Sequence, residues 1–151
     1  MGALPQSILV MGMHRSGTSC VTAVLEACGV SLGPDSDLMP PTTANPRGYF
    51  ENLAFNQICI DLLQSAGADW WKVSEFDLAS IPEGDLEKAK NALNHLISEL
   101  SGAQVFALKD PRLCFLLPAL RSIFPNPVFV HVVRSPVEVA MSLNERNGFG
   151  M

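Results

Sequence analysis

The stretch Ser7-Ile-Leu-Val-Met-Gly-Met-His-Arg-Ser-Gly-Thr-Ser19 decides the fold. It starts with a short apolar run, which is typical of a buried β-strand. A loop follows from Gly12 to Gly17, and residues Thr18–Cys28 have the pattern of a helix that ends at Gly29. This order of strand, glycine-bounded loop and helix N-terminus favours anion binding, because free N–H groups and the helix dipole attract negative charge there.

The rest of the chain predicts helices alternating with two further short strands. The expected strands cover Gln104–Leu108 and Val128–Val133. The expected helices cover residues Glu51–Ala66, a segment from a capping box at Ser80–Glu83 to Gly102, residues Asp110–Ile123, and a segment that begins after Ser135. Strands separated by helices imply a parallel sheet, and therefore an α/β fold with three α/β/α layers. Ligands of such sheets bind beyond the carboxyl ends of the strands.

Residues 33–48 form a different kind of segment. They contain Gly33, Pro34, Pro40, Pro41, Pro46 and Gly48. These residues exclude regular structure, so the segment is expected to be a long irregular loop. Such loops are uncommon in compact domains and are more often functional than not.

The composition limits the classes of function. The chain has 151 residues, with 48% hydrophobic and 17% charged, and a net charge of −5. A broad basic face for nucleic acid is excluded, whereas the low charge raises the possibility of a homodimer face. No apolar stretch is long enough for a membrane span. The four cysteines form no Cys-x-x-Cys pair and no zinc-type cluster, which indicates free thiols in the cytoplasm and no metal.

The loop from Gly12 to Gly17, which we call the phosphate loop, carries its cation at a different position from that of a nucleotide-kinase P-loop. That pattern requires a Lys directly after the second glycine, and Thr18 stands there instead. The positive charge lies earlier in the loop, at Arg15, next to His14. An Arg in this position is expected to address a shorter anionic group than the β- and γ-phosphates that the kinase Lys reaches.

Arg15-Ser-Gly-Thr-Ser19 resembles the 5′-phosphosulfate loop of sulfotransferases that use 3′-phosphoadenosine 5′-phosphosulfate (PAPS). A second signature of that family is an Arg at a strand end with a Ser eight residues later, here Arg134 and Ser142, which in the family bind the 3′-phosphate. The resemblance implies a P-loop-like sulfotransferase fold and PAPS as donor, without a metal. The donor-binding residues that it implies are His14, Arg15, Ser16, Gly17, Thr18, Ser19, Arg134 and Ser142.

The same resemblance suggests three catalytic residues. Arg15 is the candidate cation for the bridging oxygen of the donor. Glu51 resembles the catalytic carboxylate of many carbohydrate- and tyrosine-directed members, although a Glu at a helix N-terminus also complements the helix dipole. His14 is the second candidate for the base. Lys109 belongs to Lys109-Asp-Pro-Arg112, which resembles a Lys-Asp-Pro element near the transferring group, and Arg112 is expected to orient Glu51 or the acceptor.

The predicted function is sulfuryl transfer to a hydroxyl or amine of a carbohydrate or small metabolite. Residues 1–151 are expected to form one domain that lacks the usual C-terminal segment of the family. One alternative is a P-loop kinase, in which Val105–Leu108 and Asp110 would form a Walker B strand that holds Mg²⁺. Another is a non-catalytic nucleotide-binding or interaction module. Trp70 and Trp71 are candidates for a sugar platform, with packing as the simpler interpretation.

Overall fold

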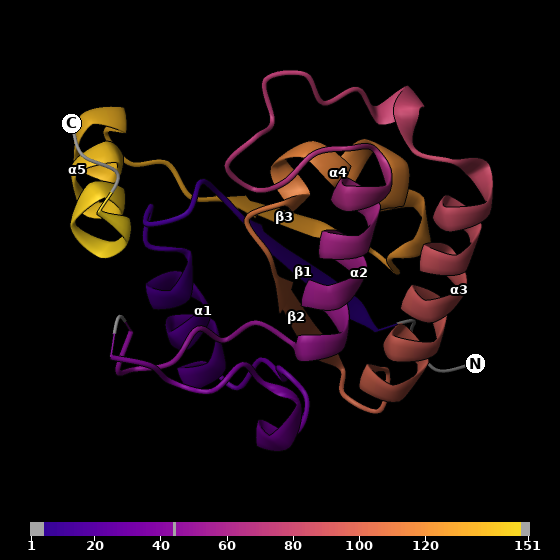
Figure 1. Cartoon of the computed structure of the whole chain (residues 1–151). Helices are drawn as coiled ribbons and strands as arrows, with labels where there is room; N and C mark the ends of the chain where they lie inside the picture. The colour runs from indigo at the N-terminus through magenta and orange to yellow at the C-terminus, as the bar shows by residue number, and fades with distance from the viewer. Residues whose placement is uncertain (1–4, 44, 149–151) are drawn as a thin grey trace.

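Three parallel strands form one sheet in the order β2-β1-β3. The computed structural model describes residues 5–43 and 45–148, and its strands are β1 (Gln6–Met11), β2 (Val105–Lys109) and β3 (Val128–His131) (Figure 1). In the register Leu9 lies opposite Leu108 on one side and Phe129 on the other. The predicted parallel α/β sheet is therefore confirmed, with β3 ending earlier than expected.

Five α-helices accompany the strands in the described part of the chain. They are α1 (Thr18–Ala27), α2 (Leu53–Ser65), α3 (Glu83–Leu100), α4 (Leu113–Leu120) and α5 (Pro136–Asn147). The predicted capping box is wrong, because α3 has Pro82 as its N-cap and no side chain caps it. Ser80 instead ends a short 3₁₀ turn, in which the Asp77 side chain accepts a hydrogen bond from the Ala79 N–H. Glu83 is therefore the first residue of α3 and not the last residue of a capping box.

The two faces of the sheet are covered by different helices. Leu9 and Met11 of β1 belong to the main hydrophobic cluster with residues of α2, α3 and α4. Val10 points to the opposite face, where α1 packs against β1 and β2 (Figure 1). Alternation along a strand sends successive side chains to opposite faces, so this short run anchors both layers. The result is the expected three-layer arrangement, with its core on the α2–α3 side.

Residues 33–48 are irregular, as predicted, apart from a 3₁₀ turn at Asp35–Asp37 and isolated bridges; residue 44 lies outside the described part. The segment returns towards the sheet through a hydrogen bond from the Met39 N–H to the Glu51 carbonyl, with N and O 2.8 Å apart. Phe50 has a φ of 58°, a conformation that is rare for a bulky side chain. The turn at Phe50 brings the loop to the carboxyl end of β2.

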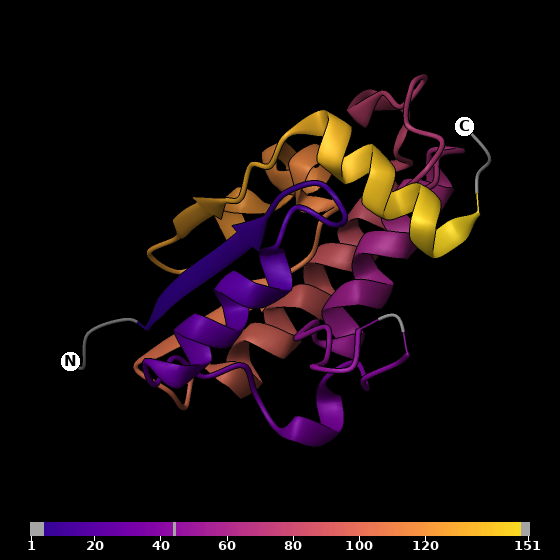
Figure 2. The same ribbon diagram turned by 90° about the vertical axis from the view of Figure 1, so that its left-hand side faces the viewer.

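Helix α5 lies at the carboxyl ends of the strands. Figure 2 shows it crossing the end of β1, beside the loop of residues 12–17. It buries Val139, whereas Val137 and Met141 are largely exposed. Ser142 of α5 accepts a hydrogen bond from Arg15 in this loop, so α5 and the loop meet at this edge of the sheet.

Gly12 is predicted to be required where β1 ends. Its φ is 154°, and a Cβ there would lie 2.4 Å from the Val132 carbonyl oxygen. We expect Gly12→Ala to lower the free energy of unfolding by about 1–3 kcal/mol, measured by urea denaturation. The control is Gly84→Ala in α3, where a Cβ meets no atom within 4 Å. That change should stabilise the chain by about 0.5–1 kcal/mol, and equal effects at both positions would contradict the packing described here.

Candidate active site

The phosphate loop connects β1 to α1 with an unusual backbone. Arg15 has a φ of 68°, and Gly17, the N-cap of α1, has a φ of 101° and ψ of 13°. No side chain caps α1, so the first N–H groups of the helix, which have no acceptor within a helix, face the loop. This arrangement supplies backbone donors and the positive end of a helix dipole to an anion.

Two side chains of the loop have buried polar atoms without a hydrogen-bond partner among the described residues. They are Ser16 Oγ and His14 Nε2. A buried polar atom left unpaired costs about 1–3 kcal/mol, so such atoms indicate a site for a ligand. Ser16 Oγ also lies 2.8 Å from the position that a Cβ on Gly12 would take, which explains why this loop needs glycine.

The two signatures of the predicted donor site meet in space. Arg15 Nε donates to Ser142 Oγ on α5 at 2.9 Å. Arg134 Nη1 donates to the Arg15 carbonyl oxygen at 3.1 Å, and Arg134 Nε also reaches Glu138 at 3.4 Å. Arg134 and Ser142 stand more than a hundred residues from Arg15 in sequence. The fold thus joins the phosphate loop to the Arg–Ser pair that follows β3.

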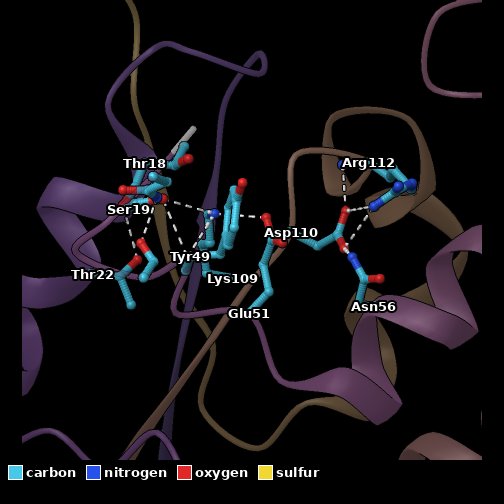
Figure 3. A network of polar contacts seen from close by, with 11 residues as sticks. Thr18, Ser19, Thr22, Tyr49, Glu51, Asn56, Lys109, Asp110 and Arg112 are labelled. Carbon is cyan, nitrogen blue, oxygen red and sulfur yellow. Dashed lines mark hydrogen bonds and ion pairs between the residues drawn. The ribbon is translucent and has the colours of Figure 1, made fainter. Parts of the chain in front are cut away.

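Lys109 lies at the centre of a network that joins three segments (Figure 3). Its ammonium donates to Glu51 Oε1 at 2.6 Å, to the Tyr49 carbonyl at 3.0 Å and to Ser19 Oγ at 3.2 Å. Both charged side chains are almost fully buried. An ammonium has three hydrogens, and three acceptors match them. Lys109 therefore holds the end of β2, the segment between the irregular loop and α2, and the start of α1 together.

Glu51 is held in place by the start of α2. Asn52 is the N-cap of that helix, and its side chain accepts from the Phe55 N–H at 3.1 Å. Glu51 therefore precedes the cap rather than lying inside the first turn. The left-handed backbone of Phe50 directly precedes it, and its carboxylate accepts from Lys109. The ion pair with Lys109, more than the helix dipole, accounts for the position of this carboxylate.

A second buried carboxylate lies next to the first pair. Asp110 is fully buried and accepts from Asn56 Nδ2 at 3.0 Å and from Arg112 Nη1 at 3.1–3.2 Å (Figure 3). Burial raises the pKa of Asp110 to about 6, while the Arg112 guanidinium opposes that rise. Arg112 therefore pairs with Asp110, whereas Glu51 pairs with Lys109, and the expectation that Arg112 orients the acceptor stays a prediction. A two-residue separation lets it reach Asp110 from the same turn of the chain.

A cavity of about 640 Å³ gathers most of the predicted site. Of the predicted site residues it is lined by His14, Arg15, Gly17, Thr18, Ser19, Glu51, Lys109 and Arg134. Ser16 and Ser142 do not line it, although Ser142 contacts Arg15. Five cationic side chains and one carboxylate line it: Arg15, Lys109, Arg112, Arg134, Arg146 and Glu51. A cavity with this excess of positive charge suits a multiply charged anion.

Sequence reasoning missed Arg146, which also lines this cavity. Its guanidinium carbon lies 5.5 Å from the ring centroid of Trp70, and the His14 ring lies 4.8 Å from the same indole. Arg146 follows Ser142 by four positions, so both lie on one face of α5, and that spacing was an available signal. Trp70 packs between side chains of the site, which favours the packing interpretation over a sugar platform.

The comparisons with known proteins agree with this geometry. Residues 5–149 match the family model described as "Sulfotransferase family", so the chain belongs to the sulfotransferase family. A comparison with curated proteins finds no match. Within residues 5–43 and 45–148, no helix is both long and apolar enough to cross a membrane. Over the same residues, no group of three or more His, Cys, Asp or Glu side chains is placed to hold a metal ion.

The raised pKa of Asp110 predicts a specific pH dependence of stability. Its carboxyl binds a proton more tightly in the folded chain than in the unfolded one, where the pKa is 3.8. That contribution is complete below pH 3.8 and is lost as the pH rises through about 6. Between pH 4 and 7 we expect the wild type to lose about 2–3 kcal/mol relative to Asp110→Asn, measured by urea denaturation.

The exposed Asp35→Asn is the control substitution for this measurement. A wild type that gains stability over Asp110→Asn as the pH rises would contradict the prediction. It would mean that the attraction of Arg112 outweighs the effect of burial on Asp110.

Proposed function

We propose that this sulfotransferase moves a sulfuryl group from PAPS to a hydroxyl or amine of a carbohydrate or small metabolite. The observation that carries the proposal is the hydrogen bond from Arg15 Nε to Ser142 Oγ at 2.9 Å. Together with the contact of Arg134 with the Arg15 carbonyl, it brings the loop that resembles a 5′-phosphosulfate loop and the Arg134–Ser142 pair to the same end of the sheet. The loop would hold one anionic group of the donor, and the Arg134–Ser142 pair would hold the other.

The residues of the loop fit the anionic end of such a donor. Gly17, Thr18 and Ser19 line the cavity, and the first backbone N–H groups of α1 have no side-chain cap. We assign the 5′-phosphosulfate to residues 14–19, with Thr18 and Ser19 adding hydroxyls, and the 3′-phosphate to Arg134 and Ser142. PAPS supplies the activated sulfuryl group and a phosphate leaving group.

The catalytic roles follow from charge and position. Arg15 would neutralise the charge that develops on the bridging oxygen, where a fixed cation acts without reorganisation. Lys109 would contribute a second positive charge after exchanging one of its three acceptors for a ligand oxygen. Glu51 lines the cavity beside Lys109 and is the proposed base for the acceptor proton.

The geometry gives less support to a P-loop kinase. Asp110 would have to hold Mg²⁺ after the Walker B-like strand β2. However, its side chain is fully buried, and both carboxylate oxygens accept hydrogen bonds from Arg112 and Asn56. The non-catalytic module remains the second candidate, because Glu51 and Lys109 neutralise each other in this structure.

The cytoplasm is the proposed location. Cys20, Cys28, Cys59 and Cys114 are free thiols. Free thiols, three of them exposed, are typical of a reducing compartment.

The donor assignment predicts selective stabilisation by 3′-phosphoadenosine 5′-phosphate (PAP), the desulfonated product. At 100 times its dissociation constant PAP should add about 2.7 kcal/mol, which is a rise of about 5–10 °C in the thermal midpoint. ATP with Mg²⁺ should add less. Arg134→Ala should lose most of the PAP effect, while Arg121→Ala, a matched change at an exposed Arg in the 3₁₀ turn after α4, should keep it. Stronger stabilisation by ATP with Mg²⁺ would favour the kinase.

The catalytic assignment predicts a different result at Glu51. Glu51→Gln keeps an oxygen acceptor for Lys109 but removes the base, so sulfuryl transfer should fall by about 10²–10⁴-fold. PAP binding should persist. The measurement is transfer of labelled sulfate from PAPS to a panel of hydroxyl and amine acceptors, with the exposed Glu75→Gln as the matched control. Binding of PAP by the wild type without transfer to any acceptor would favour the non-catalytic module.

A further inference from the structure

A second, smaller cavity adjoins the one that we assign to the donor. Its volume is about 210 Å³, and it is lined by Met13, His14, Trp70, Pro111, Arg112, Cys114, Phe115 and His131. Four of these residues also line the larger cavity: His14, Trp70, Pro111 and Arg112. A molecule in the smaller cavity would therefore lie next to the phosphate loop and beside the donor, at the residues that the two cavities share.

The lining of the smaller cavity favours an apolar occupant. Met13, Pro111 and Phe115 supply apolar surface, and no carboxylate or amide side chain is among its described lining residues. Sugars are held mainly through such polar groups, because every hydroxyl needs a partner when it is buried. An engineered cavity of about 150 Å³ is known to hold one benzene molecule, so the volume here corresponds to about one ring.

Among the shared residues, His14 and Arg112 carry polar side chains, and of these His14 can accept a hydrogen bond. The atom His14 Nε2 is buried and has no hydrogen-bond partner within the described residues. Its ring is fixed by contact with the indole of Trp70. Burial, followed by the charges of Arg112, Arg146 and Lys109, lowers the pKa of His14 to about 3. The imidazole is therefore neutral at physiological pH, and a neutral imidazole nitrogen can accept a hydrogen bond from a hydroxyl group.

We propose that the smaller cavity is the acceptor subsite, that it takes a single aromatic ring bearing a hydroxyl, and that His14 Nε2 accepts the hydrogen bond of that hydroxyl. The inference rests on the proposed function, because it needs the donor in the larger cavity. It narrows the acceptor from any hydroxyl or amine to an aromatic alcohol. His14 would hold the acceptor oxygen beside the phosphate loop in the bound complex, and the hydroxyl would turn its hydrogen to Glu51, which lines the larger cavity together with His14, when transfer occurs.

The first test measures binding of phenol to the chain saturated with PAP, by calorimetry. Cys114→Trp places an indole in the subsite, and we expect it to weaken phenol binding by about tenfold or more while PAP still binds. Cys28→Trp is the matched control, because Cys28 is an exposed cysteine at the far end of α1. This control should bind both ligands as the wild type does. Retained PAP binding also shows that each variant is folded.

The outcomes of this test separate the two proposals. Binding of PAP together with phenol affinity that Cys114→Trp leaves unchanged would overturn the subsite while the donor assignment stands. The same conclusion follows if the PAP complex binds methyl glucoside but not phenol. A chain that does not bind PAP would overturn the proposed function, and with it the inference.

The second test isolates the hydrogen bond of His14. Anisole has the ring of phenol but cannot donate a hydrogen bond, so the ratio of the two dissociation constants reports the hydroxyl alone. We expect the wild type to prefer phenol by about tenfold, and His14→Phe, which keeps a ring against Trp70, to lose the preference. A ratio that is the same in both chains would show that His14 does not hold the hydroxyl.

Discussion

The buried ion pair between Lys109 and Glu51 is the interaction on which the site depends. An ammonium withdrawn from water is tolerated where its charge is matched and its hydrogens find acceptors. Here the acceptors come from two separate segments: Tyr49 and Glu51, between the irregular loop and α2, and Ser19 of α1. The loop can therefore take few positions relative to the phosphate loop. Phe50, which lies between Tyr49 and Glu51, has a left-handed backbone, a conformation that persists only where the surrounding structure fixes it.

Much of the fold could be predicted because its signals are local. Each strand is a short apolar run, and glycine or proline lies near most helix ends, so element type and order followed from neighbouring residues. The capping box failed for a related reason, since a four-residue pattern does not say where the first helical turn begins. A 3₁₀ turn ending at Ser80 shifted the start of α3 to Glu83.

Eight of the predicted site residues line one cavity, but their pairings could not be predicted. Arg15, Lys109 and Glu51 were found from their motifs, yet nothing in the chain order says that Lys109 binds Glu51 or that Arg112 binds Asp110. Those choices depend on which side chains the sheet and the loop bring within reach. The contact of Trp70 with His14 and Arg146 joins three elements and has no local signature. The smaller cavity likewise exists only in three dimensions.

The attachment of α5 has a consequence for how binding energy is distributed. This helix buries Val139 and is otherwise tied to the phosphate loop through Ser142 and to Trp70 through Arg146. Elements with little buried apolar surface open locally at low cost. Binding of an anion to Arg15 and Ser142 together would order α5. The free energy that this ordering costs reduces the measured affinity of the anion. Amide hydrogen exchange in α5 would then be slower when the anion is bound. The order of α5 and the occupancy of the cavity are therefore thermodynamically linked.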